Sequence, residues 1–213
     1  MHDGSSISQG SNALAPSEIW PVVAAHRAGV ELRNLGFGGS ALVDPFMARV
    51  IRDAPADVIS IKLGINVVNL DAMRLRAFVP AIHGFLDTIR DGQPYTPLLL
   101  ISPLFCAIHE DTPDPEAFDP ASLGDDQIRF VATGEPGPGR LTLKMIRAEL
   151  RSLFERRSAD KNLHYLEGTD LYGPADEPLP DNLHPSAEAH RLIGARFAER
   201  VFDNGSLSGT RNG

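Results

Sequence analysis

Strand-like segments of this chain alternate with helix-like segments, and short polar motifs stand at several points where one gives way to the other. The predicted strands cover residues 30–34, 57–63, 97–102 and 163–166, and the predicted helices cover 16–28, 44–52, 71–90, 140–157 and 186–201. This alternation predicts a parallel sheet with helices on both faces. We expect the helix 71–90 to bend or break at Pro80, because proline lacks the N–H of a helical hydrogen bond.

The length of the chain fits one domain. With 213 residues, of which 42% are hydrophobic, it can bury a full core, and we assign residues 1–203 to that domain. Residues 204–213 form a Gly/Ser/Asn tail that we expect to be mobile. The segment 103–139 is rich in Pro, Asp and Gly and is too long for a routine connection, so we expect it to line or cover a pocket.

Charge and composition exclude several classes of function. The net charge of −8 leaves no basic stripe for nucleic acid. No apolar run approaches the roughly 18 residues of a membrane span. The N-terminus lacks the features of a signal peptide, so we expect a cytoplasmic protein unless a shortened N-terminus hides an export signal. The single cysteine, Cys106, excludes an internal disulfide, and we interpret it as a buried side chain rather than a nucleophile.

Four polar motifs supply the chemically useful side chains. They are Gly4-Ser5-Ser6-Ile7, Asn34-Leu35-Gly36-Phe37-Gly38-Gly39, Gly64-Ile65-Asn66 and Asp181-Asn182-Leu183-His184-Pro185. Together they contain a hydroxyl, glycine N–H groups, an amide, an imidazole and a carboxylate. Acyl transfer by a serine enzyme needs these groups as nucleophile, oxyanion donors, base and orienting acid.

In combination the motifs resemble those of the SGNH (GDSL-type) hydrolases, a family of serine esterases and acyltransferases. The family blocks Gly-Asp-Ser, Asn-x-Gly-x-x-Gly, Gly-x-Asn and Asp-x-x-His match Gly4 and Ser6; Asn34, Gly36 and Gly39; Gly64 and Asn66; and Asp181 and His184. The chain departs from the pattern at Ser5, which replaces the aspartate of the first block, and at Val67, where an aspartate often follows. The resemblance implies a flavodoxin-like three-layer α/β/α fold with a mostly parallel five-stranded sheet.

The resemblance assigns the catalytic groups. Ser6 is the expected nucleophile, with Ser5 and Ser8 as competitors. His184 is the expected base, because an imidazole can take the serine proton near neutral pH. Asp181, three residues earlier, is expected to orient the imidazole and stabilise its protonated form.

The oxyanion donors are expected to be the backbone N–H groups of Ser6 and Gly39 and the side-chain amide of Asn66. A glycine allows the main chain to approach a substrate without a Cβ in the way. The same glycines also suit a tight strand-to-helix turn, and Asn34 is expected to brace that turn rather than touch substrate.

The predicted function is cleavage of a small-molecule ester through an acyl-serine intermediate, with no cofactor. We expect no metal site, because His184 and His190 lie on different helix faces and no second cluster of ligands is visible. The sequence does not predict the acyl group, the alcohol or the oligomeric state.

Three alternatives remain open. The same site could pass the acyl group to an alcohol other than water. The loop Ser5–Ser11 could instead hold the phosphate of FMN in a flavodoxin-like binding protein. Finally, only Met1, His2 and Asp3 precede the first motif, so the first strand should be nearly absent. That would follow from truncation of a longer chain, which we favour, or would mark a non-catalytic interaction domain.

Overall fold

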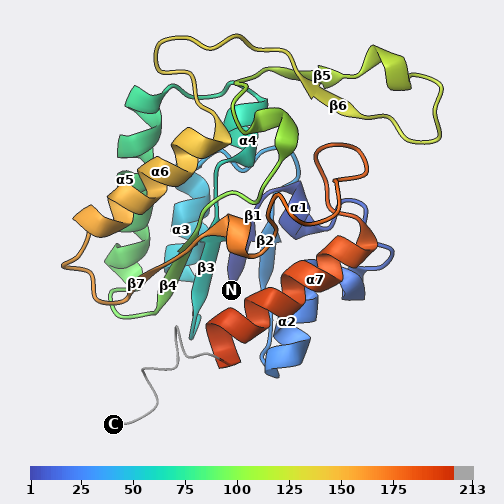
Figure 1. The fold of residues 1–213 in the computed structure, drawn as a ribbon. Helices are drawn as coiled ribbons and strands as arrows, with labels where there is room; N and C mark the ends of the chain where they lie inside the picture. Colours follow the sequence, from blue (N-terminus) through green and yellow to red (C-terminus); the bar gives the residue numbers. More distant parts are fainter. Residues whose placement is uncertain (204–213) are drawn as a thin grey trace.

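A five-stranded sheet forms the centre of the computed structural model, which describes residues 1–203 (Figure 1). The predicted tail at 204–213 lies outside the described residues. The strand order is β2-β1-β3-β4-β7, and every neighbouring pair is parallel. The strands are β1 (His2–Gly4), β2 (Asn34–Gly36), β3 (Ile59–Lys62), β4 (Leu98–Ile101) and β7 (Leu163–Leu166). The prediction of an α/β fold with a parallel sheet and helices on both sides is confirmed.

The expectation that the first strand is nearly absent is wrong. β1 has three residues and pairs with β2 on one side and β3 on the other, so it lies inside the sheet. The chain terminus itself extends the pairing, because the Met1 ammonium donates to the Val58 carbonyl at 2.8 Å. Three residues are enough for β1 to pair along the whole length of β2, because β2 also has only three residues.

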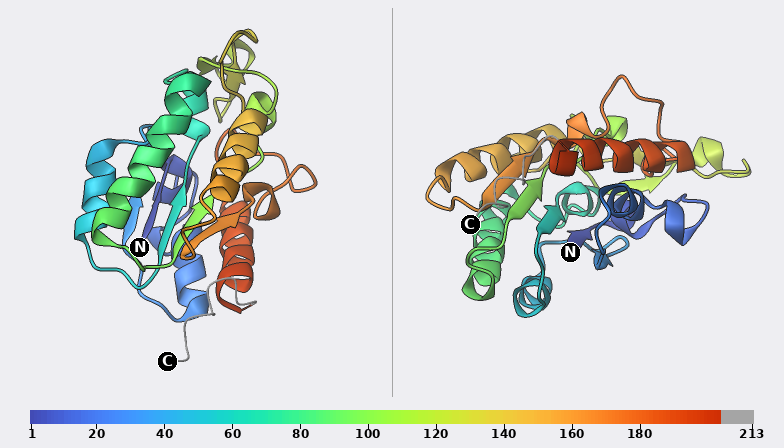
Figure 2. Two further views of the ribbon diagram at one scale, coloured as in Figure 1. Left: turned by 90° about the vertical axis from the view of Figure 1, so that its left-hand side faces the viewer. Right: turned by 90° about the horizontal axis from the view of Figure 1, so that it is seen from below.

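Helices cover both faces of the sheet (Figure 2). Helices α3 (Pro45–Asp53) and α5 (Leu75–Gly92) pack together on one face. Helix α6 (Leu143–Arg156) covers the same face, where it contacts α5 and its Phe154 ring stacks on Tyr165 of β7. Helices α2 (Trp20–Ala28) and α7 (Ala187–Ala198) pack along each other on the other face. In the described part of the chain, none of the helices combines the length and apolar character needed to cross a membrane.

The core lies along β3 and β4. All residues of both strands are buried, as expected for a parallel sheet covered on two faces. The apolar run Leu98–Ile101 therefore has no polar face, whereas β3 places Ser60 and Lys62 among its apolar residues.

Two predicted elements differ from the structure. The strand predicted at 30–34 is observed at Asn34–Gly36, because only these residues pair with β1. Helix α5 continues through Pro80 instead of breaking there. Pro80 is exposed, so the carbonyl group that loses its helical partner can bond to water.

The segment 103–139 contains a small hairpin that the sequence analysis did not predict. A short helix, η2 (Ala107–His109), leads to β5 (Glu116–Phe118), and η3 (Pro120–Ser122) leads to β6 (Phe130–Ala132). Strands β5 and β6 pair antiparallel as a separate two-stranded sheet at the top of Figure 1.

The second motif is hydrogen-bonded through the Asn34 side chain to the helix that follows the first motif. β1 leads into α1 (Ser6–Gln9), and the Asn34 amide donates to the Ser8 carbonyl at 2.8 Å. The Gly36 N–H donates to Asn34 Oδ1 at 2.9 Å. A Cβ on Gly36 would lie 2.5 Å from the Gln9 backbone nitrogen, so α1 needs glycine at this position to lie against β2.

Substitution of Gly36 should therefore be costly. We expect Gly36→Ala to lower the free energy of unfolding by about 1–3 kcal/mol, because the added methyl meets backbone that cannot rotate away. The matched control is Gly84→Ala in α5, where a Cβ would meet nothing within 4 Å. That variant should be up to about 1 kcal/mol more stable. Urea unfolding of both proteins tests this, and equal stabilities would contradict it.

A buried carboxyl group and a buried ammonium group lie at the centre of the sheet, on the adjacent strands β1 and β3. Asp3 of β1 is 4% exposed and Lys62 of β3 is 2% exposed. Burial raises the pKa of Asp3 to about 7, although the Gly4 N–H and the Lys62 ammonium oppose the shift. Burial lowers the pKa of Lys62 to about 8, opposed by Asp3. The two charges therefore offset only part of the cost of their burial.

The raised pKa of Asp3 predicts a pH dependence of stability. Between the ordinary pKa of 3.8 and the folded value of about 7, the folded state holds a proton that the unfolded state has lost. This contribution to stability is present at low pH and disappears as the pH rises toward 7. We expect the wild type to lose about 2 kcal/mol more stability than Asp3→Asn between about pH 5 and pH 7. Parallel urea titrations test it, with Asp126→Asn as a control for loss of an exposed carboxylate; identical slopes for wild type and Asp3→Asn would refute it.

Candidate active site

The three serines after β1 have different environments. Ser5 is buried and caps α1, with its Oγ accepting the Ile7 N–H at 3.4 Å. Ser8 is fully buried, and its Oγ lies 2.8 Å from His2 Nε2. Ser6, the first residue of α1, is only partly buried. Its hydroxyl is therefore the one of the three that remains accessible to a substrate.

His184 lies beside Ser6 although the two are far apart in sequence. Ser6 Oγ and His184 Nε2 are 3.0 Å apart. The other ring nitrogen, Nδ1, lies 2.8 Å from Asp181 Oδ2. The structure thus places the three predicted side chains in one continuous chain of hydrogen bonds.

The carboxylate of Asp181 is held at several points. Its Oδ1 accepts the backbone N–H groups of Leu183 at 2.9 Å and His184 at 2.6 Å. Burial raises the pKa of Asp181, but the hydrogen bonds from the His184 ring and from these N–H groups outweigh it and leave the pKa below its ordinary value. The carboxylate is therefore ionised at neutral pH and can stabilise a protonated imidazole.

Two supporting residues were not predicted from the sequence. The Asn12 amide donates to Asp181 Oδ2 at 3.1 Å from the loop after α1. His190 of α7 accepts the Trp20 N–H at 3.2 Å through Nδ1, and its Nε2 donates to the Ser11 carbonyl at 2.9 Å. The contacts of Asn12 and His190 depend on tertiary packing, so the sequence gives little sign of them. The one hint is the small polar run around Asn12.

Besides the Ser6 N–H, the predicted oxyanion donors lie in the glycine loop after β2 and in the first turn of the short helix α4. Gly39 is exposed and left-handed, with φ of 69°. Asn66 is buried in α4 (Ile65–Asn69), where its Oδ1 accepts the Ala41 N–H at 3.0 Å. Its Nδ2 lies 3.4 Å from Asn69 Oδ1, which is a long hydrogen bond. Asn66 therefore ties the glycine loop to α4 and keeps N–H capacity on its amide nitrogen.

The hairpin of the long segment contacts the catalytic loop. The Phe130 N–H donates to the Asp181 carbonyl at 2.9 Å, and the Asn182 amide donates to the Phe130 carbonyl at 3.0 Å. The ring of Phe130 meets the His184 ring edge to face, with centroids 5.8 Å apart. Phe118 continues this aromatic surface at 5.4 Å from Phe130.

Cys106 lies under the same loop. It is 2% exposed, as predicted, and its thiol contacts the Asn182 carbonyl at 3.2 Å. Burial raises the pKa of the Cys106 thiol, so it stays protonated and is a poor nucleophile.

A cavity in the described part of the chain lies away from this site. It has a volume of about 500 Å³ and is lined by residues that include Met1, Trp20, Leu32 and Phe202. It lies at the amino ends of β1, β2 and β3, whereas Ser6 follows the carboxyl end of β1. Ligands of open parallel sheets bind at carboxyl ends, so the cavity does not change the location of the candidate site.

Solved structures share this fold. The salicylyl-acyltransferase SsfX3 from a tetracycline biosynthetic pathway is 27% identical, with a TM-score of 0.76 over 97% of this chain and 54% of that chain. A carbohydrate acetylesterase family member from Sinorhizobium meliloti is 20% identical, with a TM-score of 0.62 over 94% and 95%. A member of the lipolytic G-D-S-L family from Veillonella parvula is 15% identical, with a TM-score of 0.60 over 95% and 96%. This chain spans about half the length of the acyltransferase.

Comparison with curated protein sequences finds no match. The sequence profile of the GDSL-like lipase/acylhydrolase family, in contrast, matches residues 4–192. The match begins at the motif that contains Ser6 and extends past the motif that contains His184, so it includes all four motifs. The chain belongs to the GDSL-like lipase/acylhydrolase family.

Proposed function

We propose that this protein is a serine esterase that cleaves a small-molecule ester through an acyl-serine intermediate. The observation that carries the proposal is the chain of hydrogen bonds from Ser6 Oγ through the His184 ring to Asp181, with steps of 3.0 Å and 2.8 Å. Nucleophile and base lie within the distance at which a proton passes directly between them.

In the first half-reaction, Ser6 Oγ attacks the ester carbonyl carbon while His184 Nε2 takes the hydroxyl proton. The imidazolium that forms is stabilised by Asp181, whose oxygen lies against Nδ1. The tetrahedral intermediate collapses when the C–O bond to the alcohol breaks, and His184 returns the proton to the departing oxygen. The product of this step is an ester of Ser6.

The negative oxygen of the intermediate needs donors fixed in advance. Ser6 N–H belongs to the first turn of α1, whose N–H groups have no partner within the helix. We assign the other donors to the Gly39 N–H and the Asn66 Nδ2. The Asn66–Ala41 hydrogen bond supports the assignment, because it holds both donors relative to each other.

In the second half-reaction, a hydroxyl compound replaces the alcohol. His184 removes its proton, the oxygen attacks the acyl-serine, and Ser6 leaves with the proton returned from His184. Water gives hydrolysis, and another alcohol gives acyl transfer. The chemistry of the triad is the same in both cases.

The aromatic surface beside His184 favours a substrate that carries an apolar substituent. Phe130 covers one edge of the imidazole, and Phe118, which is 58% exposed, extends the apolar surface outward along the hairpin. An acyl or alcohol portion with an apolar group would bury this surface on binding.

The observations that suggested a phosphate-binding protein and a non-catalytic domain do not support those alternatives in the structure. The serines proposed to hold a phosphate are used within the fold, because Ser5 caps α1 and Ser8 is buried against His2. The non-catalytic reading depended on a missing first strand, and β1 is present and paired on both sides. Acyl transfer keeps its support, because SsfX3 is an acyltransferase at 27% identity.

Loss of the Ser6 hydroxyl should abolish turnover. We expect Ser6→Ala to lower kcat for p-nitrophenyl acetate by at least about 10³-fold, since no acyl-enzyme can form. A fluorophosphonate probe should label the wild type at Ser6 and leave Ser6→Ala unlabelled. Ser17→Ala, which removes an exposed hydroxyl in the same N-terminal region, should keep both activity and label. Undiminished turnover by folded Ser6→Ala would rule out the proposed nucleophile.

The acceptor can be identified by competition. We expect the wild type to release p-nitrophenol from p-nitrophenyl butyrate and to partition the acyl group between water and an added alcohol. If the physiological reaction is hydrolysis, the free acid remains the main product at about 1 M alcohol, and the rate does not rise. If it is acyl transfer, the new ester dominates. Chromatography of the products measures the ratio, and Ser6→Ala should form neither product.

A further inference from the structure

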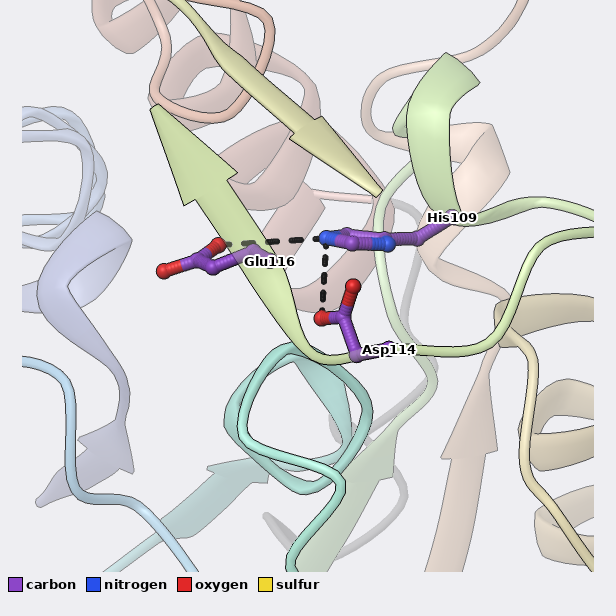
Figure 3. A group of neighbouring side chains, drawn as sticks. All are labelled: His109, Asp114 and Glu116. Atoms are coloured by element: carbon purple, nitrogen blue, oxygen red, sulfur yellow. Dashed lines mark ion pairs between the residues drawn. The ribbon is translucent and has the colours of Figure 1, made fainter. Parts of the chain in front are cut away.

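His109, Asp114 and Glu116 form a group of buried polar side chains at the base of the hairpin (Figure 3). His109 ends η2, Glu116 begins β5, and Asp114 lies between them. In Figure 3 the two carboxylates approach the same ring nitrogen of the histidine from different directions. His109 Nε2 lies 3.3 Å from Asp114 Oδ2 and 3.8 Å from Glu116 Oε2.

These groups are costly to bury as they stand. The side chains of His109 and Asp114 are fully buried, and that of Glu116 is 19% exposed. Within residues 1–203, no hydrogen-bond partner reaches His109 Nδ1 or Nε2, either oxygen of Asp114, or Glu116 Oε2. Buried polar atoms of native proteins nearly always have partners. Five without one in a single cluster indicate that the cluster binds something.

We propose that His109, Asp114 and Glu116 bind a divalent transition-metal cation such as Zn²⁺. Donor atoms that bind zinc at 2.0–2.2 Å in a tetrahedral shell lie about 3.3–3.6 Å from one another. The two distances from His109 Nε2 fall at and just beyond this range. One imidazole nitrogen and two carboxylate oxygens are a donor set that suits Zn²⁺ or Mn²⁺ better than Ca²⁺, which takes more oxygen ligands.

The charges of the cluster also favour a cation. Asp114 and Glu116 place two carboxylates against one imidazole, and within the described residues no hydrogen-bond donor reaches either oxygen of Asp114. Arg140 pairs with Asp71 at 2.9 Å and donates to the backbone carbonyl of Asp114. A dication would neutralise both carboxylates at once, and its bond to Nε2 would leave the ring proton of His109 on Nδ1.

The position of the cluster gives the cation a structural role. It would join η2 to the first residue of β5, and β5 pairs with β6. Phe130 of β6 is hydrogen-bonded to the Asp181–Asn182 segment and packs on His184. The cation would therefore fix the hairpin that lies against the catalytic loop. This inference concerns residues outside the proposed triad and does not depend on the reaction.

The test is binding of ZnCl₂ to the full-length protein after removal of metal with EDTA. Calorimetric titration should give one equivalent, and zinc at about 100 times its Kd should raise Tm by about 5 °C or more. MnCl₂ should compete for the same site. No heat and no change in Tm with either metal would overturn the proposal.

Variants locate the site. Glu116→Gln should weaken zinc binding by at least about tenfold, because an amide oxygen is a poorer ligand than a carboxylate. In the metal-free form it should be at least as stable as the wild type, since it removes a negative charge next to Asp114. A merely structural Glu116 would instead lower Tm without zinc, and that result would count against the proposal.

Two controls separate this site from other zinc ligands. Asp111→Asn, which changes an exposed carboxylate two residues after His109, should bind zinc like the wild type. His184→Gln, which removes the imidazole paired with Asp181, should also keep one equivalent. Zinc binding that is lost in His184→Gln and kept in Glu116→Gln would place the metal at the triad and overturn the assignment.

Discussion

The packing of α7 against α2 is the constraint on which the candidate active site depends. Ser6 follows the first strand, and His184 precedes α7 near the other end of the chain, so the contact between α7 and α2 helps to bring the two side chains together. The contact is polar as well as apolar. His190 of α7 accepts the first N–H of α2 and donates to the Ser11 carbonyl, so one buried imidazole joins both helices to the loop after α1. Desolvation lowers the pKa of His190, which keeps the ring neutral and able to accept and donate at once.

The hairpin adds a second constraint on the same imidazole. Asp181 is bound from one side by Asn12 and from the other by the backbone of Phe130, so its loop is held by segments more than a hundred residues apart in sequence. A triad geometry is useful only if the imidazole keeps its orientation through both half-reactions. The fold achieves this by surrounding a loop with fixed donors rather than by placing His184 inside a helix. Any movement of the hairpin would therefore change the position of the Asp181 carbonyl, and with it the ring that the carboxylate orients.

The sequence predicted those parts that depend on local pattern. Strand β4 follows from a continuous apolar run, β3 and β7 follow from short segments that alternate with predicted helices, and Ser6, Asp181 and His184 follow from motifs of fixed spacing. It failed where the outcome depends on pairing between distant segments. β1 has too few residues to show a pattern of its own and exists because two neighbours pair with it. No periodic pattern in the sequence marks Asn12, Phe130 or the His109–Asp114–Glu116 cluster. These residues lie in loops and short strands, and what they contact depends on the tertiary structure.

In the proposed mechanism, hydrolysis and acyl transfer differ only in whether water reaches the acyl-serine. The segments that cover the ester bond of that intermediate would therefore decide which acceptor reacts. In this chain the covering element closest to His184 is the hairpin, through Phe130 and the exposed Phe118 beyond it. Its two strands are short, and a pair of three-residue strands is weak by itself. Its position must then be set at its ends, by the Phe130 backbone at one and by the buried cluster around Glu116 at the other. In the proposed mechanism, the acceptor of the second half-reaction would then also depend on the His109–Asp114–Glu116 cluster, whose side chains lie outside the triad.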